Sequence, residues 1–163
     1  MRKLGIIAVL ALMVTALAAV PALAASPHFL RQSATINDSG ALVVTFKEAG
    51  LGNALESANY TLNATGTATY ACVNRGEKHP QAANKESFEQ QLTDEGTFPV
   101  RNGSVTGSLS VGPVPSTLDC PGGQREVLVS VSYTNVELYS EASDTTITFG
   151  TVGPKTINPV EGV

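Results

Sequence analysis

The feature that most constrains the fold is a long alternation of residue types at residues 60–72. Its even positions hold Tyr, Leu, Ala, Gly, Ala, Tyr and Cys, while its odd positions hold Thr or Asn until Ala71. A period of two over this length predicts a β-strand with one buried face and one solvent-facing face. Cys72 falls on the buried face, a position that suits a buried disulfide.

A second alternation covers residues 127–138 and changes its phase on the way. Apolar residues occupy the odd positions from 127 to 133 and then the even positions 136 and 138. One extra residue in a strand moves its apolar set to the other parity. The change therefore predicts a β-bulge at Thr134-Asn135.

Shorter strands are predicted at residues 29–36, 41–48, 85–92, 105–111 and 145–149. Turn residues separate them, with a hairpin at Asp38-Ser39-Gly40, a turn at residues 93–96 and another at Asn102-Gly103. No segment has a convincing helical period, and the two glycines of residues 49–57 favour a loop there.

The predicted fold class is all-β: a single antiparallel β-sandwich of about seven strands, Ig-like or a related Greek key. The chain has no Trp, so the buried Trp of antibody domains is absent and the Ig-like topology is an analogy. A jelly roll or a partially closed barrel stays open as an alternative.

The first 24 residues have the three parts of a cleavable signal peptide. Arg2 and Lys3 precede an apolar run of residues 4–20, and Ala22-Leu23-Ala24 provides small residues for cleavage after Ala24. A retained membrane anchor is the alternative, because a spanning helix needs roughly 20 apolar residues. We expect export to the medium or the periplasm, with residues 25–163 forming one domain that has a loose carboxyl tail from about residue 151.

The charge of the mature chain restricts its partners. Loss of Arg2 and Lys3 leaves eight basic residues against 14 acidic ones, a net charge near −6. Nucleic acid and anionic membranes attract basic surfaces. We therefore expect neither as a partner, and no membrane insertion of the mature chain.

Cys72 and Cys120 are the only cysteines, and an exported chain meets an oxidising environment. We predict that they form a disulfide, with two separate buried thiols as the alternative. The bond would bring together two long irregular segments, residues 74–84 and 112–124. We expect these loops to share one end of the sandwich.

The candidate binding residues are few. Arg75, Glu77, Lys78 and His79 form the densest charge cluster of the mature chain, in the first loop. Such a cluster is a polar contact patch or simply a solvated loop tip. Tyr139, at the end of a predicted strand, is the best exposed aromatic residue for stacking on a ligand.

No set of residues predicts catalysis, a metal site or a cofactor. His28 and His79 have no metal-ligand spacing, and Ser104 lies beside an Asn-Gly hairpin turn rather than in a nucleophile elbow. The acids Asp38, Asp94, Glu95 and Asp144 fall in predicted turns, where carboxylates mainly cap backbone amides. We predict no enzyme, although a hydrolase with carboxylates from separate strands is an alternative.

Four segments resemble a group of small exported bacterial proteins of unassigned function: VTFKEAGLG (residues 44–52), TYACVN (69–74), PQAANK (80–85) and STLDCP (116–121). The cysteine contexts are the most specific part. The resemblance implies a secreted two-cysteine β domain and no activity.

These observations together favour a non-catalytic module that binds a protein or an envelope component through the disulfide-linked loops. Loops on a rigid scaffold are where β-sandwiches usually place recognition. Besides the hydrolase, an inhibitor of extracellular proteases that presents the second loop is an alternative.

Overall fold

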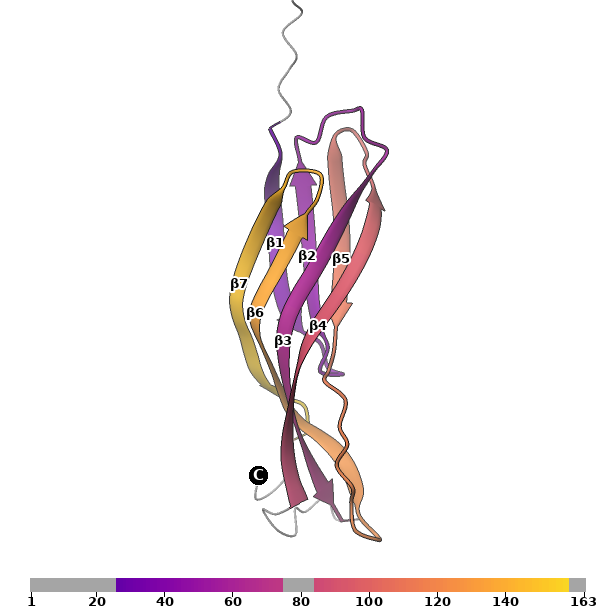
Figure 1. Ribbon diagram of the computed structural model, residues 1–163, viewed down its shortest axis with the longest axis vertical. Helices are drawn as coiled ribbons and strands as arrows, with labels where there is room; N and C mark the ends of the chain where they lie inside the picture. Colours follow the sequence, from indigo (N-terminus) through magenta and orange to yellow (C-terminus); the bar gives the residue numbers. More distant parts are fainter. Residues whose placement is uncertain (1–25, 75–83, 159–163) are drawn as a thin grey trace, which may run out of the picture.

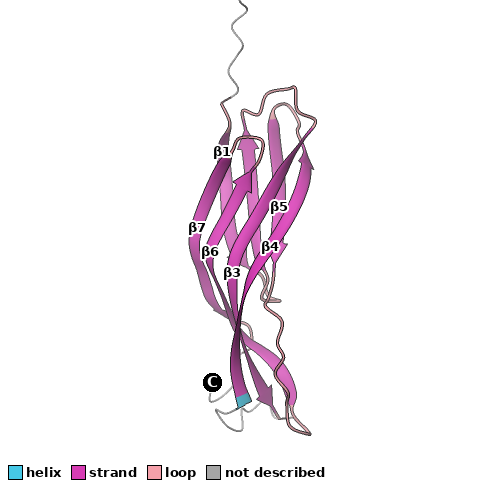
Figure 2. Cartoon of the chain, viewed as in Figure 1, coloured by secondary structure: helices cyan, strands magenta, loops and turns pink. Residues whose placement is uncertain are grey.

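The computed structural model describes residues 26–74 and 84–158. Within these ranges the chain forms seven strands and no α-helix (Figures 1 and 2). The strands are β1 (His28–Ile36), β2 (Leu42–Ala49), β3 (Ser57–Val73), β4 (Lys85–Pro99), β5 (Ser104–Val111), β6 (Arg125–Ser140) and β7 (Thr145–Thr156). No helix of the described residues is long and apolar enough to cross a membrane.

The strands form two antiparallel sheets that face each other as a sandwich (Figure 1). One sheet has the order β1-β2-β5 and the other β4-β3-β6-β7. In the Ig constant arrangement the fourth strand pairs with the fifth, whereas here β4 pairs with β3. The predicted all-β sandwich is thus confirmed. It is an Ig-like Greek key in which the fourth strand belongs to the sheet of β3, rather than to the sheet of β5 as in the Ig constant arrangement.

The core lies between the sheets and follows the predicted alternation. Along β3, the even positions from Tyr60 to Tyr70 contribute buried apolar residues to it. Three rings link the two layers: Phe46 of β2 lies 4.4 Å from the ring centroid of Tyr60 and 5.4 Å from that of Phe98. The outward Thr and Asn residues pair across strands instead, as in the hydrogen bond from Thr93 Oγ1 to Asn63 Oδ1.

The four-stranded sheet is longer than its partner. β3 has 17 residues and β2 has 8, which at about 3.3 Å per residue corresponds to roughly 56 Å against roughly 26 Å. β3, β4 and β6 therefore continue past the sandwich as a twisted ribbon, seen in the lower part of Figure 1. A second apolar cluster, Ala71, Val73, Val127 and Val129, is buried in this extension.

The bulge predicted in β6 is confirmed. The pairing of β6 with β7 shifts between Tyr133 and Val136, and Asn135 has a positive φ of 51°. Asn tolerates this left-handed conformation better than most residues. The extra residue lets both Tyr133 and Leu138 face the core.

The turn predicted at residues 93–96 is wrong, because β4 runs through it to Pro99. β3 pairs with β4 from Ser57 to Ala71, and Leu62 lies opposite Asp94 in the register. Instead of capping a turn of its own strand, Asp94 Oδ2 accepts a hydrogen bond from the Ser110 amide at 2.9 Å. Position 96 suits glycine, because a Cβ there would lie less than 3.0 Å from side-chain atoms of Phe98 and Leu109.

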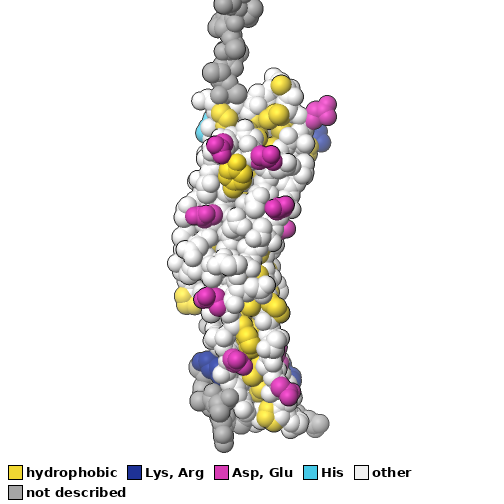
Figure 3. Space-filling view, viewed as in Figure 1, with side chains coloured by type: hydrophobic (Ala, Val, Ile, Leu, Met, Phe, Trp, Pro, Cys, Tyr) yellow, Lys and Arg dark blue, Asp and Glu magenta, His cyan; other side chains and the backbone are white. Residues whose placement is uncertain are grey.

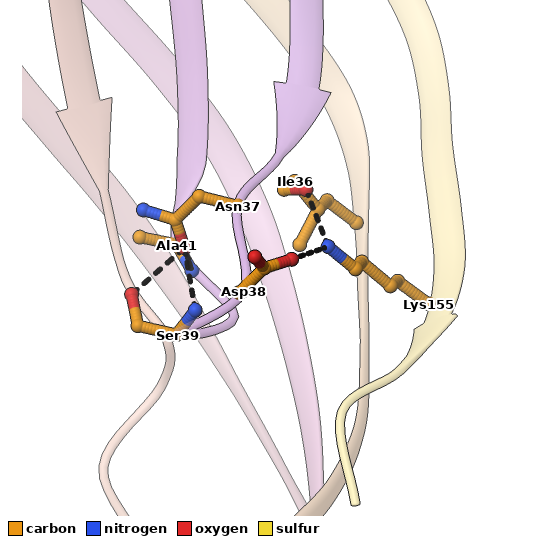
Figure 4. Close-up of polar contacts among 6 residues, drawn as sticks. All are labelled: Ile36, Asn37, Asp38, Ser39, Ala41 and Lys155. Atoms are coloured by element: carbon orange, nitrogen blue, oxygen red, sulfur yellow. Dashed lines mark hydrogen bonds and ion pairs between the residues drawn. The ribbon is translucent and has the colours of Figure 1, made fainter.

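The loose carboxyl tail predicted from about residue 151 is also wrong for residues 151–156, which belong to β7. The contacts of Lys155 help to hold residues 151–156 in place. Its Nζ donates to the Ile36 carbonyl at 3.0 Å and pairs with Asp38 Oδ1 at 2.9 Å (Figure 4). β7 is thereby tied to the β1–β2 hairpin of the other sheet.

The hairpin predicted at Asp38-Ser39-Gly40 is confirmed, and Asn37 organises it (Figure 4). Asn37 Oδ1 accepts hydrogen bonds from the Ser39 amide at 3.0 Å and from the Ala41 amide at 2.9 Å. Gly40 supplies the positive φ of 89° that the turn needs. The turn fixes the register of β1 against β2.

Candidate functional site

The predicted disulfide is confirmed. Cys72 and Cys120 are bonded with a Cα–Cα distance of 5.5 Å, and no free cysteine remains. The bond joins the end of β3 to the segment of residues 112–124 at the lower end of the molecule in Figure 1. A disulfide indicates an oxidising compartment, either extracellular or periplasmic.

The described parts of the two predicted loops meet at this end. Asn84, which closes the first loop, donates from Nδ2 to Gln124 Oε1 of the second at 3.3 Å. A hollow of about 470 Å³ lies between the end of β3 and the start of β6, lined by Val73, Asn74, Gly123, Gln124 and Arg125. We call this region, residues 72–74, 84 and 120–125, the disulfide end.

Residues 112–124 were predicted to be irregular, and they are also well anchored. Val114 is buried, and its carbonyl accepts a hydrogen bond from the Tyr70 hydroxyl at 2.7 Å. Burial raises the pKa of Tyr70, so the phenol stays neutral and can donate. Ser116 Oγ donates to Glu126 Oε2 at 2.8 Å. The segment is therefore held against β3 and β6 by these hydrogen bonds.

The predicted binding residues divide between two regions. Arg75, Glu77, Lys78 and His79 lie outside the described residues. Tyr139 is half-buried on the outer face of the four-stranded sheet, opposite Thr61, and its hydroxyl donates to Asp144 Oδ1 at 3.1 Å. That hydrogen bond raises the pKa of Tyr139.

Tyr139 cannot share a site with the disulfide. Thr61, its partner in the register, and Cys72 lie on the same strand, and eleven residues of a strand span about 36 Å. Tyr139 therefore lies near the start of β3, and the disulfide lies near its end. Tyr139 is also committed to Asp144, so it is a weaker stacking surface than the sequence implied.

Two carboxylates do share one depression, but their surroundings do not favour hydrolysis. Glu95 and Glu141 line a depression of about 310 Å³ on the outer face of the four-stranded sheet. Both side chains are exposed, whereas a glycosidase keeps its general acid in an apolar pocket. Glu141 Oε2 accepts a hydrogen bond from Asn59 Nδ2 at 2.8 Å. Among the described residues, no group of His, Cys, Asp and Glu side chains could hold a metal ion.

The two outer faces differ in charge. Figure 3 shows the four-stranded side, where carboxylates are scattered along the length of the sheet. β1, β2 and β5 form the far side in Figure 1, and together they contain one acidic residue, Glu48, which is fully buried. Arg31 and Lys47 are exposed on that side.

The sequence interpretation missed Arg31 and Lys47. They are opposite each other in the β1–β2 register and line a shallow groove of about 720 Å³. No motif could have indicated this pair, because the two residues come from different strands. The strand pairing alone brings them together.

Comparisons with protein-family models, with curated proteins and with solved structures found no match to this chain. The resemblance to small exported two-cysteine proteins stays a prediction.

Proposed function

We propose that the protein is an exported, non-catalytic binding module that presents its disulfide end to a protein or an envelope component. The leader-like residues 1–24 and the disulfide both support export, since disulfides persist in oxidising compartments. Cleavage after Ala24 and secretion or periplasmic release belong to this proposal.

The observation that supports the proposal is the Cys72–Cys120 disulfide on the ribbon formed by β3, β4 and β6. Cys120 holds the second loop against β3, and Gln124 of that loop contacts Asn84 at the far boundary of the first. A ribbon with its own apolar cluster keeps this end rigid. Rigid presentation lowers the entropy that a partner must remove on binding.

Co-sedimentation with envelope material of the host tests the proposal. The purified protein is compared with a variant that carries Arg75→Ala, Lys78→Ala and His79→Ala, the predicted contact residues of the first loop. The matched control carries His28→Ala and Arg101→Ala, which remove exposed side chains near the opposite end of the sandwich.

We expect the parent and the control to sediment with the envelope and the loop variant to remain in solution. Equal binding by all three proteins would show that the disulfide end is not the contact surface. No binding by the parent would remove the envelope as the partner.

A further inference from the structure

A shallow groove crosses the outer face of the three-stranded sheet. Its sides are two outward rows in the strand register, Arg31–Lys47–Thr106 and Ser33–Thr45–Ser108. Outward rows lie about 7 Å apart, because alternate residues of a strand share a face. The groove therefore presents two cations and four hydroxyl groups across a width that fits one sugar ring.

The two cations are an unfavourable pair in the protein alone. Side chains directly opposite on antiparallel strands have Cβ atoms about 5 Å apart, and like charges in that position destabilise a sheet. Within the described ranges, neither Arg31 nor Lys47 makes an ion pair or a side-chain hydrogen bond. The only acid of the three strands, Glu48, faces the core. An anion from outside the protein would relieve the repulsion.

An exposed apolar residue, Leu30, directly precedes the groove residue Arg31 in β1. The register of β1 shifts between Phe29 and Arg31, so Leu30 is the extra residue of a β-bulge. Phe29 packs against Phe46 with ring centroids 6.4 Å apart, and Leu30 is left 52% exposed next to Arg31. Bulges often redirect side chains near functional sites. An exposed Leu here offers contact area to the C–H face of a sugar.

We propose that this groove binds an oligosaccharide that carries an isolated carboxylate, at a site separate from the disulfide end. The planar guanidinium of Arg31 can grip a carboxylate with two hydrogen bonds, and Lys47 adds a point charge beside it. The Ser and Thr hydroxyls match the hydroxyl groups of neighbouring sugars. Arg31 and Lys47 are the only Lys or Arg residues of β1, β2 and β5. The groove therefore matches one carboxylate rather than a dense run of them, and the ligand's acidic sugars are separated by neutral ones.

Isothermal titration with defined oligosaccharides tests the site. The probe is a hyaluronan oligosaccharide, in which glucuronate alternates with N-acetylglucosamine, and the neutral comparison is a chitin oligosaccharide of equal length. The parent is compared with Arg31→Gln/Lys47→Gln and with the control Lys85→Gln/Arg101→Gln, which removes two exposed cations elsewhere. The loop variant at Arg75, Lys78 and His79 is titrated as well, so that this site and the disulfide end are judged separately.

The parent should bind hyaluronan and not chitin, and binding should weaken as salt rises. Arg31→Gln/Lys47→Gln should weaken binding at least about tenfold, which equals about 1.4 kcal/mol. The control and the loop variant should bind as the parent does. The groove variant should also melt at the same temperature as the parent or higher, because it removes the repulsion.

Three results would overturn the proposal. They are no binding of hyaluronan by the parent, an equal loss in the control variant, and binding of chitin or of a short polyglutamate peptide as tight as that of hyaluronan. A lower melting temperature of the groove variant would show that Arg31 and Lys47 stabilise the fold instead.

Discussion

The fully buried carboxylate of Glu48 offers a quantitative test of the core. Its Oε2 accepts hydrogen bonds from the Tyr60 hydroxyl at 2.7 Å and the Ser140 hydroxyl at 2.8 Å. Its Oε1 has no partner in the part of the chain that the structure describes. Tyr60→Phe would remove one of the two donors and leave the carboxylate with a single hydrogen bond.

The expected loss follows from the hypothesis that these hydroxyls donate to a charged acceptor. A hydrogen bond to a charged group contributes about 1.5–3 kcal/mol, and a neutral one about 0.5–1.5 kcal/mol. Tyr133 provides the matched control, because it is equally buried and its hydroxyl donates to the neutral Gly40 carbonyl at 2.6 Å. Tyr60→Phe should thus lower the free energy of unfolding by about 2–3 kcal/mol, and Tyr133→Phe by about 1 kcal/mol.

Urea unfolding at neutral pH measures both losses, with an unchanged m value as the sign that only stability has changed. In a Glu48→Gln background the acceptor is neutral, so the cost of Tyr60→Phe should fall to about 1 kcal/mol. Two results would refute the view that these hydroxyls donate to a buried charge. One is an equal loss of unfolding free energy in Tyr60→Phe and Tyr133→Phe. The other is a cost of Tyr60→Phe that is the same in the Glu48→Gln background as in the parent.

Three further predictions concern the disulfide, the buried hydroxyl of Tyr133 and the ion pair. Cys72→Ala and Cys120→Ala should each lower the free energy of unfolding by about 4 kcal/mol, because the bond closes a loop with a sequence separation of 48. This would be contradicted if a reductant left the unfolding curve of the parent unchanged. Burial raises the pKa of Tyr133 to about 12, against about 10 when unfolded. Its contribution to stability is therefore complete below about pH 10 and is lost as the pH rises toward that raised value; phenolate absorbance of a folded Tyr133 near pH 10 would argue against it. The hydrogen bond and the charge of Lys155 lower the pKa of Asp38, so this contribution is present above about pH 4 and is lost as the pH falls. Lys155→Met should remove it, which would make the acid unfolding curve of the variant flatter than that of the parent.

The sequence predicted those parts of the fold that one strand records in its own pattern. The alternation of β3 and the parity change in β6 each have such a local signature, and each is confirmed. The disulfide, also confirmed, followed instead from the presence of only two cysteines in a chain expected to be exported. The two errors, at residues 93–96 and 151–156, both ended a strand at residues typical of turns. In each case pairing with a longer neighbour, β3 or β6, continues the strand. Long-range pairing thus overrides local turn chemistry.

The groove shows why a surface site on a sheet escapes sequence analysis. Arg31 lies opposite Lys47 because the Asn37 turn sets the hairpin register, and a slip of one residue would turn one of them toward the core. Both Phe29 and Leu30 are apolar, so the pattern of β1 cannot tell which of them faces inward. The core decides, because the ring of Phe29 meets Phe46 and buries more area than Leu30 would. The cation pair and the exposed Leu30 are therefore consequences of one turn and one bulge, and they become visible only once the register is known.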